Sequence, residues 1–162
     1  MSVRTGIGYD SHRFAAGRPL RLGGHLIPHT HGLVGHSDGD AVLHAVTDAI
    51  LGAAAAGDIG SFFPDTDPQW QGADSARFVQ AAVLAAKANG LTVHHVDVTI
   101  IAEQPRMAPH VLAMRAATAK ALGIGMDHVS VKAKTNEGMG LVGSGEGAAA
   151  FAVATLTGGV AP

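Results

Sequence analysis

The sequence predicts a single α+β domain, built on a mixed β-sheet that helices cover on one face. Three observations support this fold class. The 162 residues suit one compact domain, and the 47% of hydrophobic residues is enough for a core. Strand-like and helix-like segments also succeed one another without a linker or an internal repeat. We therefore expect one domain over residues 1–162.

Strands are indicated by short segments that are rich in β-branched residues or alternate in polarity, and that end at glycine or polar turns. They cover residues 3–10, a hairpin over 19–27 that turns at Gly23-Gly24, and residues 91–102, 129–135 and 148–156. Longer apolar segments bounded by capping residues and glycines indicate helices, and these cover residues 39–56, 75–89 and 107–122. For the first helix we expect Asp38 as the N-cap, Asp40 in the first turn and Gly57 as the stop.

Two segments are expected to be loops. Residues 29–40, HTHGLVGHSDGD, are rich in glycine and small polar residues. Residues 57–75, GDIGSFFPDTDPQWQGADS, are rich in proline, glycine and aspartate. The second is long for a compact domain, and loops of that length often carry function.

Composition excludes several classes of protein. The net charge of −2 and the 4% of aromatic residues argue against a nucleic-acid binder. Only 15% of the residues are charged, below the roughly 25% typical of soluble domains, so we expect other subunits to cover some apolar surface. The chain lacks cysteine, so a metal would need His, Asp, Glu or backbone oxygen.

No segment resembles a signal peptide or a membrane span. The start, Met1 to Arg4, lacks an apolar core. The apolar stretch from Ala41 to Gly57 is short for a bilayer and contains His44 and Asp48. We expect a cytoplasmic protein with no membrane partner.

The strongest candidate site is a metal centre. Asp10 and His12 are two residues apart in a predicted strand, so their side chains point the same way. His44 on the following helix would complete a set of two His and one carboxylate, as in catalytic zinc sites, and Asp40 would accept its other N–H. Satisfied polar pairs are the alternative, and spacing alone slightly favours them because it does not show that the strand and the helix meet.

Two further segments suggest phosphate chemistry. His36 and Ser37 precede a helix N-terminus, where free N–H groups favour anions, although an ordinary capped helix start explains them as well. Thr135 offers a hydroxyl and Glu137 an oxygen ligand suited to Mg²⁺ or Mn²⁺ beside a diphosphate, and a solvated turn is the alternative. Residues 138–143 match G-x-G-x-x-G, but further glycines stand where a helix should begin, which argues against a dinucleotide fold.

Taken together, these segments resemble the 2-C-methyl-D-erythritol 2,4-cyclodiphosphate synthase family of the non-mevalonate isoprenoid pathway. The resemblance rests on G-x-D-x-H at residues 8–12, on GHSDGDAVLHAVTDAILGAAAAGDIGSFFPDTDP, on VDVTIIAEQPRM and on KAKTNEGMG. These blocks follow one another in the family's order and cover nearly the whole chain.

The resemblance implies roles for individual positions. It matches Asp10, His12 and His44 to zinc ligands, and it matches His36 and Ser37 to a mobile loop that contacts substrate phosphate. The positions that match the pocket for the methylerythritol part are Asp58, Ile59, Gly60, Phe63 and Asp65.

It also implies a nucleotide pocket and a second metal. The positions that match the cytidine pocket are Ala102, Pro105, Arg106 and Met107. Thr135, with Lys134 before it, matches the diphosphate contact, and Glu137 matches the ligand of a second divalent metal, Mg²⁺ or Mn²⁺.

The implied reaction is an internal phosphoryl transfer. In 4-diphosphocytidyl-2-C-methyl-D-erythritol 2-phosphate, the 2-phosphate attacks the β-phosphorus and CMP leaves, so the enzyme is a phosphorus–oxygen lyase. Zinc would hold the attacking side and the Glu137 metal would bridge the diphosphate. The family forms homotrimers with active sites between subunits.

The chain departs from the family pattern at two positions. Ser144 and Phe151 stand where many members carry an Arg and a Glu that help bind isoprenoid diphosphates on the trimer axis, so we expect weak or absent binding of such ligands. Two alternatives of other classes stay open: a phosphate-binding module without catalysis, and a zinc phosphohydrolase in which water attacks.

Overall fold

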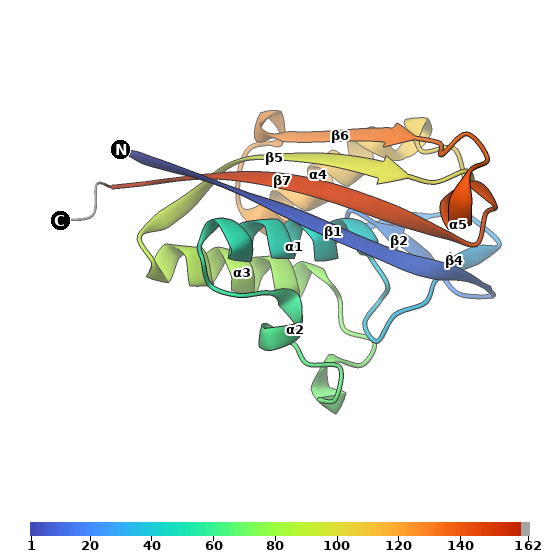
Figure 1. Cartoon of the computed structure of the whole chain (residues 1–162), viewed down its shortest axis with the longest axis horizontal. Helices are drawn as coiled ribbons and strands as arrows, with labels where there is room; N and C mark the ends of the chain where they lie inside the picture. The colour runs from blue at the N-terminus through green and yellow to red at the C-terminus, as the bar shows by residue number, and fades with distance from the viewer. Residues whose placement is uncertain (160–162) are drawn as a thin grey trace.

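The computed structural model describes residues 1–159 and forms one α+β domain (Figure 1). Its strands are β1 (Ser2–Ala16), β2 (Leu20–Leu22), β3 (His25–Ile27), β4 (His31–Leu33), β5 (Leu91–Ile101), β6 (Val129–Lys134) and β7 (Gly147–Gly158). Its α-helices are α1 (Ala41–Ala53), α2 (Ile59–Phe62), α3 (Ala76–Ala88), α4 (Val111–Leu122) and α5 (Gly140–Gly143). Short 3₁₀ turns cover Pro68–Trp70, Ala108–His110 and Met126–His128.

The main sheet has five strands in the order β4-β1-β7-β5-β6, and β2 pairs with β3 in a separate hairpin. The sheet is mixed, as expected, because β5 and β6 run parallel while the other pairs are antiparallel. The longest pairing joins β1 to β7, from Ser2 opposite Gly158 to Arg13 opposite Gly147. The first and last strands are therefore neighbours in the middle of the sheet.

Two glycines in β1 allow α1 to lie directly on the sheet. A Cβ atom at Gly6 would stand 2.1 Å from the carbonyl oxygen of Ala49, and one at Gly8 would stand 1.8 Å from that of Ala45. Side chains of alternate residues in a strand share a face, so Asp10 and His12 lie on this same face. Close packing of β1 on α1 thus brings both residues up to His44.

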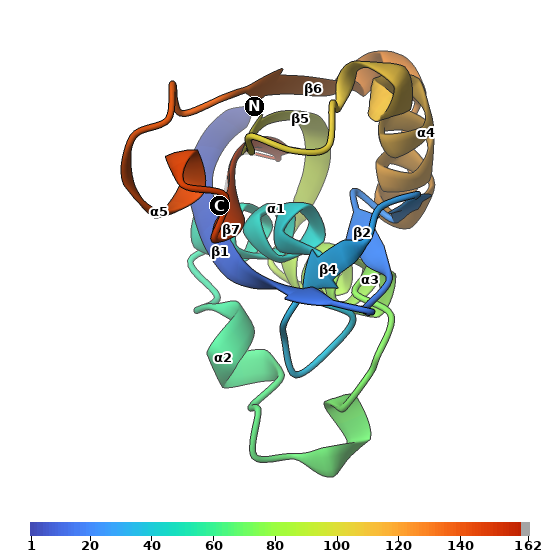
Figure 2. The same cartoon turned by 90° about the vertical axis from the view of Figure 1, so that its right-hand side faces the viewer.

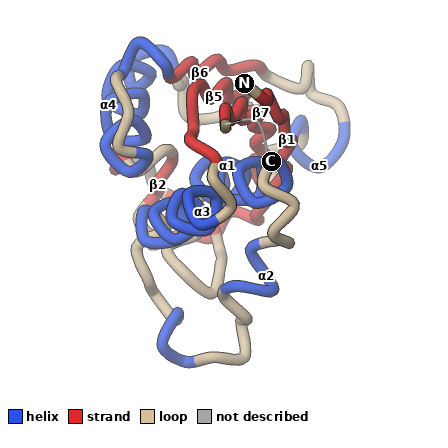
Figure 3. Tube along the Cα trace, turned by 90° about the vertical axis from the view of Figure 1, so that its left-hand side faces the viewer, coloured by secondary structure: helices blue, strands red, loops and turns tan. Residues whose placement is uncertain are grey.

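The long helices cover one face of the sheet, as expected. Figures 2 and 3 show α1 packed under the sheet with α3 beside it, while α4 lies along the β6 edge. The short helix α5 is the exception, because it lies on the other side of β1 and β7 from α1 (Figure 2). Most of that outer face is open, and it exposes the apolar side chains Val3, Ile7, Tyr9, Phe151 and Val153.

Several boundaries differ from the expectation. β1 continues to Ala16, because its ladder with β7 extends past Asp10 and its last residues pair with β4, a short strand inside the segment expected to be a loop. The first helix ends at Ala53 rather than at Gly57. The third begins at Val111, after a 3₁₀ turn.

The N-cap of the first helix is also corrected. Asp40, not Asp38, caps α1 by accepting from the backbone N–H of Leu43. The second expected loop contains the single helical turn α2, which Asp58 caps through the N–H of Ser61. Within residues 1–159, no helix combines the length and apolar character that crossing a bilayer requires.

Candidate metal centre and substrate cavities

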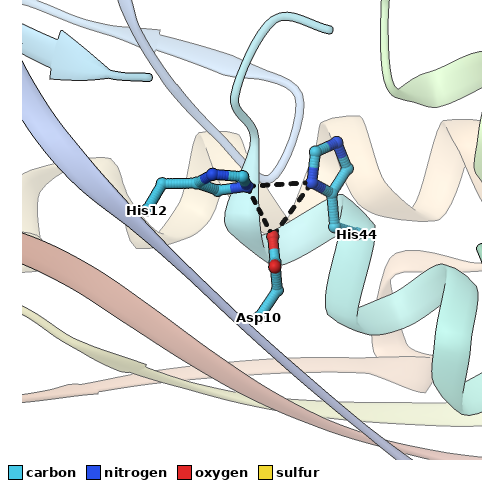
Figure 4. Close-up of side chains that lie close together, drawn as sticks. All are labelled: Asp10, His12 and His44. Atoms are coloured by element: carbon cyan, nitrogen blue, oxygen red, sulfur yellow. Dashed lines mark hydrogen bonds and ion pairs between the residues drawn. The ribbon is translucent and has the colours of Figure 1, made fainter. Parts of the chain in front are cut away.

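Asp10, His12 and His44 converge at one point between β1 and α1 (Figure 4). Asp10 Oδ2 lies 2.7 Å from His12 Nε2 and 2.9 Å from His44 Nδ1. The two ring nitrogens are 3.1 Å apart. The three residues predicted as metal ligands thus present one oxygen and two nitrogens to a common point, as the spacing alone could not show.

The charges of this cluster depend on one another. Burial raises the pKa of Asp10, but hydrogen bonds from His12 and His44 outweigh this effect and bring the pKa down to about 2. Burial lowers the pKa of His12, yet its hydrogen bond to Asp10 and the charge of Asp10 raise it above its usual value overall. Asp10 is therefore an ionised carboxylate at neutral pH, as a metal ligand must be.

The second ring nitrogen of His44 is held by two serines. His44 Nε2 lies 2.9 Å from Ser37 Oγ and 2.9 Å from Ser75 Oγ. His44, Ser37 and Ser75 are all buried. Because these contacts occupy Nε2, they direct Nδ1 toward Asp10 and His12.

The prediction that Asp40 orients His44 is wrong. Asp40 is buried, and its carboxylate accepts from the backbone N–H groups of Gly23, Gly24 and Leu43. Among residues 1–159 it makes no hydrogen bond to the His44 ring. Asp40 instead joins the turn of the β2–β3 hairpin to the start of α1, and a helical spacing of four cannot distinguish this role from a contact with His44.

The chemistry of the donor set fits a divalent metal. Two imidazoles and one carboxylate form the three-ligand set of catalytic zinc sites, which leave a fourth position for substrate. Hydrogen bonding of the distal nitrogen, seen here at His44, is the usual support of a metal-ligating imidazole. Each of the three groups is only partly buried or lies at a cavity wall, so a ligand can reach them.

A cavity of about 450 Å³ opens beside the cluster. His12 and His44 form one side of it. Predicted substrate residues in its wall are His36, Ser37, Ile59, Gly60, Phe63 and Asp65. The structure therefore brings the predicted phosphate loop and most of the predicted methylerythritol pocket to the metal centre.

Asp58 lies outside this wall. Its carboxylate accepts from the N–H and the hydroxyl of Ser61 and is exposed. These hydrogen bonds lower the pKa of Asp58. In this chain Asp58 caps α2, and its predicted contact with substrate stays a prediction.

Aromatic residues that sequence reasoning missed complete the wall. Trp70 and Phe78 line the cavity with Phe63. The rings of Phe63 and Phe78 stack with centroids 4.4 Å apart, and Trp70 meets Phe63 edge-on at 4.9 Å. In a chain with 4% aromatic residues, the clustering of a tryptophan and phenylalanines in and just after one long loop was a signal of this wall.

A second cavity, of about 330 Å³, lies at the carboxyl ends of the parallel strands β5 and β6. All of the predicted cytidine-pocket residues line it, as do Lys134 and Thr135. This cavity and the cavity at the metal centre share no lining residue. The two halves of the predicted substrate site are thus built at separate places on one chain.

Glu137 follows this second cavity in an exposed turn. Its backbone has a φ of 52°, in the left-handed region that non-glycine residues rarely adopt. The hydroxyl of Thr135 lies 3.4 Å from the Glu137 carboxylate. The turn therefore holds Thr135 and Glu137 together, and the binding of a second metal there stays a prediction.

Comparison with known proteins identifies the family. The YgbB family model matches residues 3–157. The chain is 53% identical over 154 residues to the 2-C-methyl-D-erythritol 2,4-cyclodiphosphate synthase of Pseudomonas paraeruginosa, covering 95% of this chain and 98% of that protein. It is 52% identical, with the same coverage, to the synthase of Alkaliphilus oremlandii.

Solved structures share the fold. A 2C-methyl-D-erythritol-2,4-cyclodiphosphate synthase in a CDP-bound form has a TM-score of 0.87 and 39% identity, covering 95% of this chain and 100% of that chain. The CDP complex of IspF from Plasmodium falciparum has a TM-score of 0.85 and 31% identity, covering 97% of each chain. The chain belongs to the YgbB family, whose members include the 2-C-methyl-D-erythritol 2,4-cyclodiphosphate synthases that it matches along nearly its whole length.

Proposed function

We propose that the protein converts 4-diphosphocytidyl-2-C-methyl-D-erythritol 2-phosphate to 2-C-methyl-D-erythritol 2,4-cyclodiphosphate and releases CMP. The observation that carries this proposal is the convergence of Asp10, His12 and His44 beside a cavity of about 450 Å³. The relatives' names and the CDP-bound neighbours support it. In the reaction, an oxygen of the 2-phosphate bonds to the β-phosphorus while the bond from that phosphorus to the CMP oxygen breaks.

The metal centre is proposed to hold zinc. Asp10, His12 and His44 would bind it, and zinc bound there supplies positive charge to phosphate oxygens as a Lewis acid. We further propose that Glu137 holds Mg²⁺ or Mn²⁺ beside the substrate diphosphate, since hard oxygen ligands suit both ions.

The protein side chains have mainly a positioning role. The two reacting phosphates belong to one substrate, and holding them in contact can lower the barrier by about 7 kcal/mol. Ser37 and His36 lie in the cavity wall next to the metal centre, where they can donate to phosphate. The aromatic wall of Phe63, Trp70 and Phe78 presents apolar surface to the carbon skeleton and limits access of water.

We also propose that the protein is a homotrimer whose active sites lie between subunits. Low charge and the exposed apolar residues of the outer sheet face support burial of that face against other copies. The separation of the two cavities supports a shared site, because one copy would supply the metal centre and a neighbour the cytidine pocket.

Phosphorus NMR of the reaction product tests the proposed activity. We expect signals of a cyclic diphosphate together with CMP, because attack is intramolecular. Inorganic phosphate as the product would instead indicate a zinc phosphohydrolase, and unchanged substrate would indicate a binding module.

His44→Ala tests the role of the metal centre. We expect loss of turnover and of bound zinc, with the fold retained, because the remaining pair of ligands holds zinc weakly. Leu112→Ala, an exposed residue of α4, is a matched control that should keep both. Full activity of His44→Ala would contradict the proposal.

A further inference from the structure

Asp38, Ser75 and His44 form a continuous hydrogen-bonded series that ends at the metal centre. Ser75 Oγ donates to Asp38 Oδ1 over 2.5 Å. The same Ser75 oxygen lies 2.9 Å from His44 Nε2. Neither Asp38 nor Ser75 is among the predicted site residues. The role inferred below for this hydrogen-bonded series rests on the proposed metal site.

The direction of these hydrogen bonds follows from which groups carry hydrogen. An ionised carboxylate only accepts, and a hydroxyl has one hydrogen to give. Since Ser75 gives its hydrogen to Asp38, its oxygen can only accept from His44. When Nδ1 serves a metal, the proton of the neutral His44 ring therefore lies on Nε2, where Ser75 accepts it, and the Nδ1 electron pair faces Asp10 and His12.

The series is fixed in place at its far end. Ser75 also donates its backbone N–H to Asp38 Oδ2, and the Asp38 N–H donates to the carbonyl of Ala73. Both oxygens of Asp38 thus accept from Ser75, at the start of α3. Ser75 has an exposed fraction of 0%, so bulk water does not compete for these groups.

We infer that Ser75 and Asp38 are positioning residues that hold His44 in the tautomer able to bind a metal through Nδ1. Ser75, at the start of α3, thus accepts the N–H of His44, which is the role expected for Asp40. The carboxylate of Asp38 holds the Ser75 hydroxyl in place. Ser37 Oγ accepts from the same Nε2–H, and its own hydrogen is left for Ser75 or for a phosphate in the cavity.

Nitrogen NMR of the zinc-loaded wild-type protein, labelled with ¹⁵N-histidine, tests the tautomer directly. We expect the His44 signals to show a protonated Nε2 and an unprotonated, metal-bound Nδ1. Signals that place the proton on Nδ1 would overturn the inference, and this measurement does not depend on turnover.

Asp38→Ala tests the origin of that tautomer. Alanine removes both acceptor oxygens, which receive the N–H and the hydroxyl of Ser75 and the N–H of Asp40. The Ser75 hydroxyl is then released to donate to His44 Nε2. We expect the proton of His44 to shift toward Nδ1 and zinc affinity to fall about 10- to 100-fold, as for other residues that support metal ligands.

Ser75→Ala removes the acceptor itself, and we expect a fall in zinc affinity within the same range. Ser130→Ala is the matched control, since Ser130 also stands beside an aspartate, its register partner Asp97 on β5, but far from the metal centre on β6. It should bind zinc as the wild type does. Affinities are measured by competition with a chromophoric chelator, and circular dichroism checks the fold.

The outcomes separate the two proposals. If the wild type binds no zinc at this cluster, the proposed function fails. If the wild type binds zinc and folded Asp38→Ala or Ser75→Ala binds it equally well, the positioning role is wrong. If Ser75→Ala does not fold, the tautomer of the wild type and the affinity of Asp38→Ala still decide the question.

Discussion

At the scale of single residues, three aspartates of this chain differ in the groups that their carboxylates hydrogen-bond. Asp10 lies within hydrogen-bond distance of two imidazole nitrogens, whereas Asp40 accepts from three backbone N–H groups and Asp38 accepts from Ser75 and from the Asp40 N–H. The first arrangement places a carboxylate oxygen beside two imidazole nitrogens, where a metal can bind, while the other two use their oxygens to hold the backbone in place. Sequence spacing did not distinguish these roles.

Asp40→Asn should destabilise the fold by about 3 kcal/mol. The remaining oxygen can still serve Gly23 and Leu43, which share one carboxylate oxygen, but the new amide faces the N–H of Gly24. Thermal and urea unfolding measure the change. Asp74→Asn is the control, because Asp74 accepts from Ala76 at an exposed helix start and asparagine caps as well as aspartate. Equal stabilities of the two variants would contradict the role of Asp40.

Zinc affinity should depend on pH through His12. Its pKa lies above the usual 6.5 in the metal-free chain, so below that raised pKa a proton occupies the metal-binding ring. Affinity is then expected to fall at least about tenfold per pH unit on acidification and to level off above the raised pKa. Asp10, with a pKa of about 2, adds no competition near neutral pH. Chelator competition between about pH 5 and pH 8 measures the profile, and a flat profile would contradict it.

At the scale of elements, the site depends on how closely β1 approaches α1. Gly6 and Gly8 leave room for the helix backbone, and the next two residues on that face are metal ligands. The same glycines that first suggested a short, interrupted strand are the reason why the strand and the helix meet. Glycines that interrupt the strand pattern in the sequence thus allow the strand to pack closely on the helix in the fold.

Gly8→Ala should cost about 3 kcal/mol or more and should weaken zinc binding, because a Cβ atom would stand 1.8 Å from the Ala45 oxygen and push β1 from α1. Gly52→Ala provides the control. Gly52 is helical, and an alanine methyl group there would have no atom of another element within 4 Å, so alanine should stabilise by about 0.5–1 kcal/mol. Unfolding and zinc titration measure both, and normal zinc binding by a folded Gly8→Ala variant would contradict this account.

Sequence patterns predicted that the long elements exist, with errors at the ends of β1 and α1, and predicted the short elements poorly. The hairpin at Gly23-Gly24, the helix from Ala76 to Ala88 and the strand from Leu91 to Ile101 have strong local signals and are confirmed. Strand β4 was missed because three residues carry too little pattern, and pairing with β1 stabilises it instead. The Asp38–Ser75 contact was out of reach because it joins segments far apart in the chain.

At the scale of the whole molecule, the outer face of the sheet exposes several large apolar side chains to solvent. Ile7 is 69% exposed and Tyr9 54% exposed, and the Tyr9 ring packs at 4.8 Å against Phe151 on the adjacent strand. Helices bury the other face of the same strands. Association of copies through the outer face would give this sheet a second buried side.

Ile7→Lys should dissociate the proposed trimer, because burying three ammonium groups in an apolar interface is costly. Light scattering coupled to size-exclusion chromatography measures the mass. Leu84→Lys is the control, since Leu84 is similarly exposed at 65% but lies on α3, on the helical side of the sheet. An Ile7→Lys variant that keeps the wild-type mass would contradict assembly through this face.

The position of β7 has a consequence for how the molecule forms. It is the last strand of the sheet to be synthesised, yet it lies between β1 and β5. Until β7 leaves the ribosome, the β4-β1 pair and the β5-β6 pair have no strand to join them, and closing so long a loop costs chain entropy. Contacts of this sequence separation slow folding, so the nascent protein exposes two unpaired sheet edges for as long as β7 is still to be made.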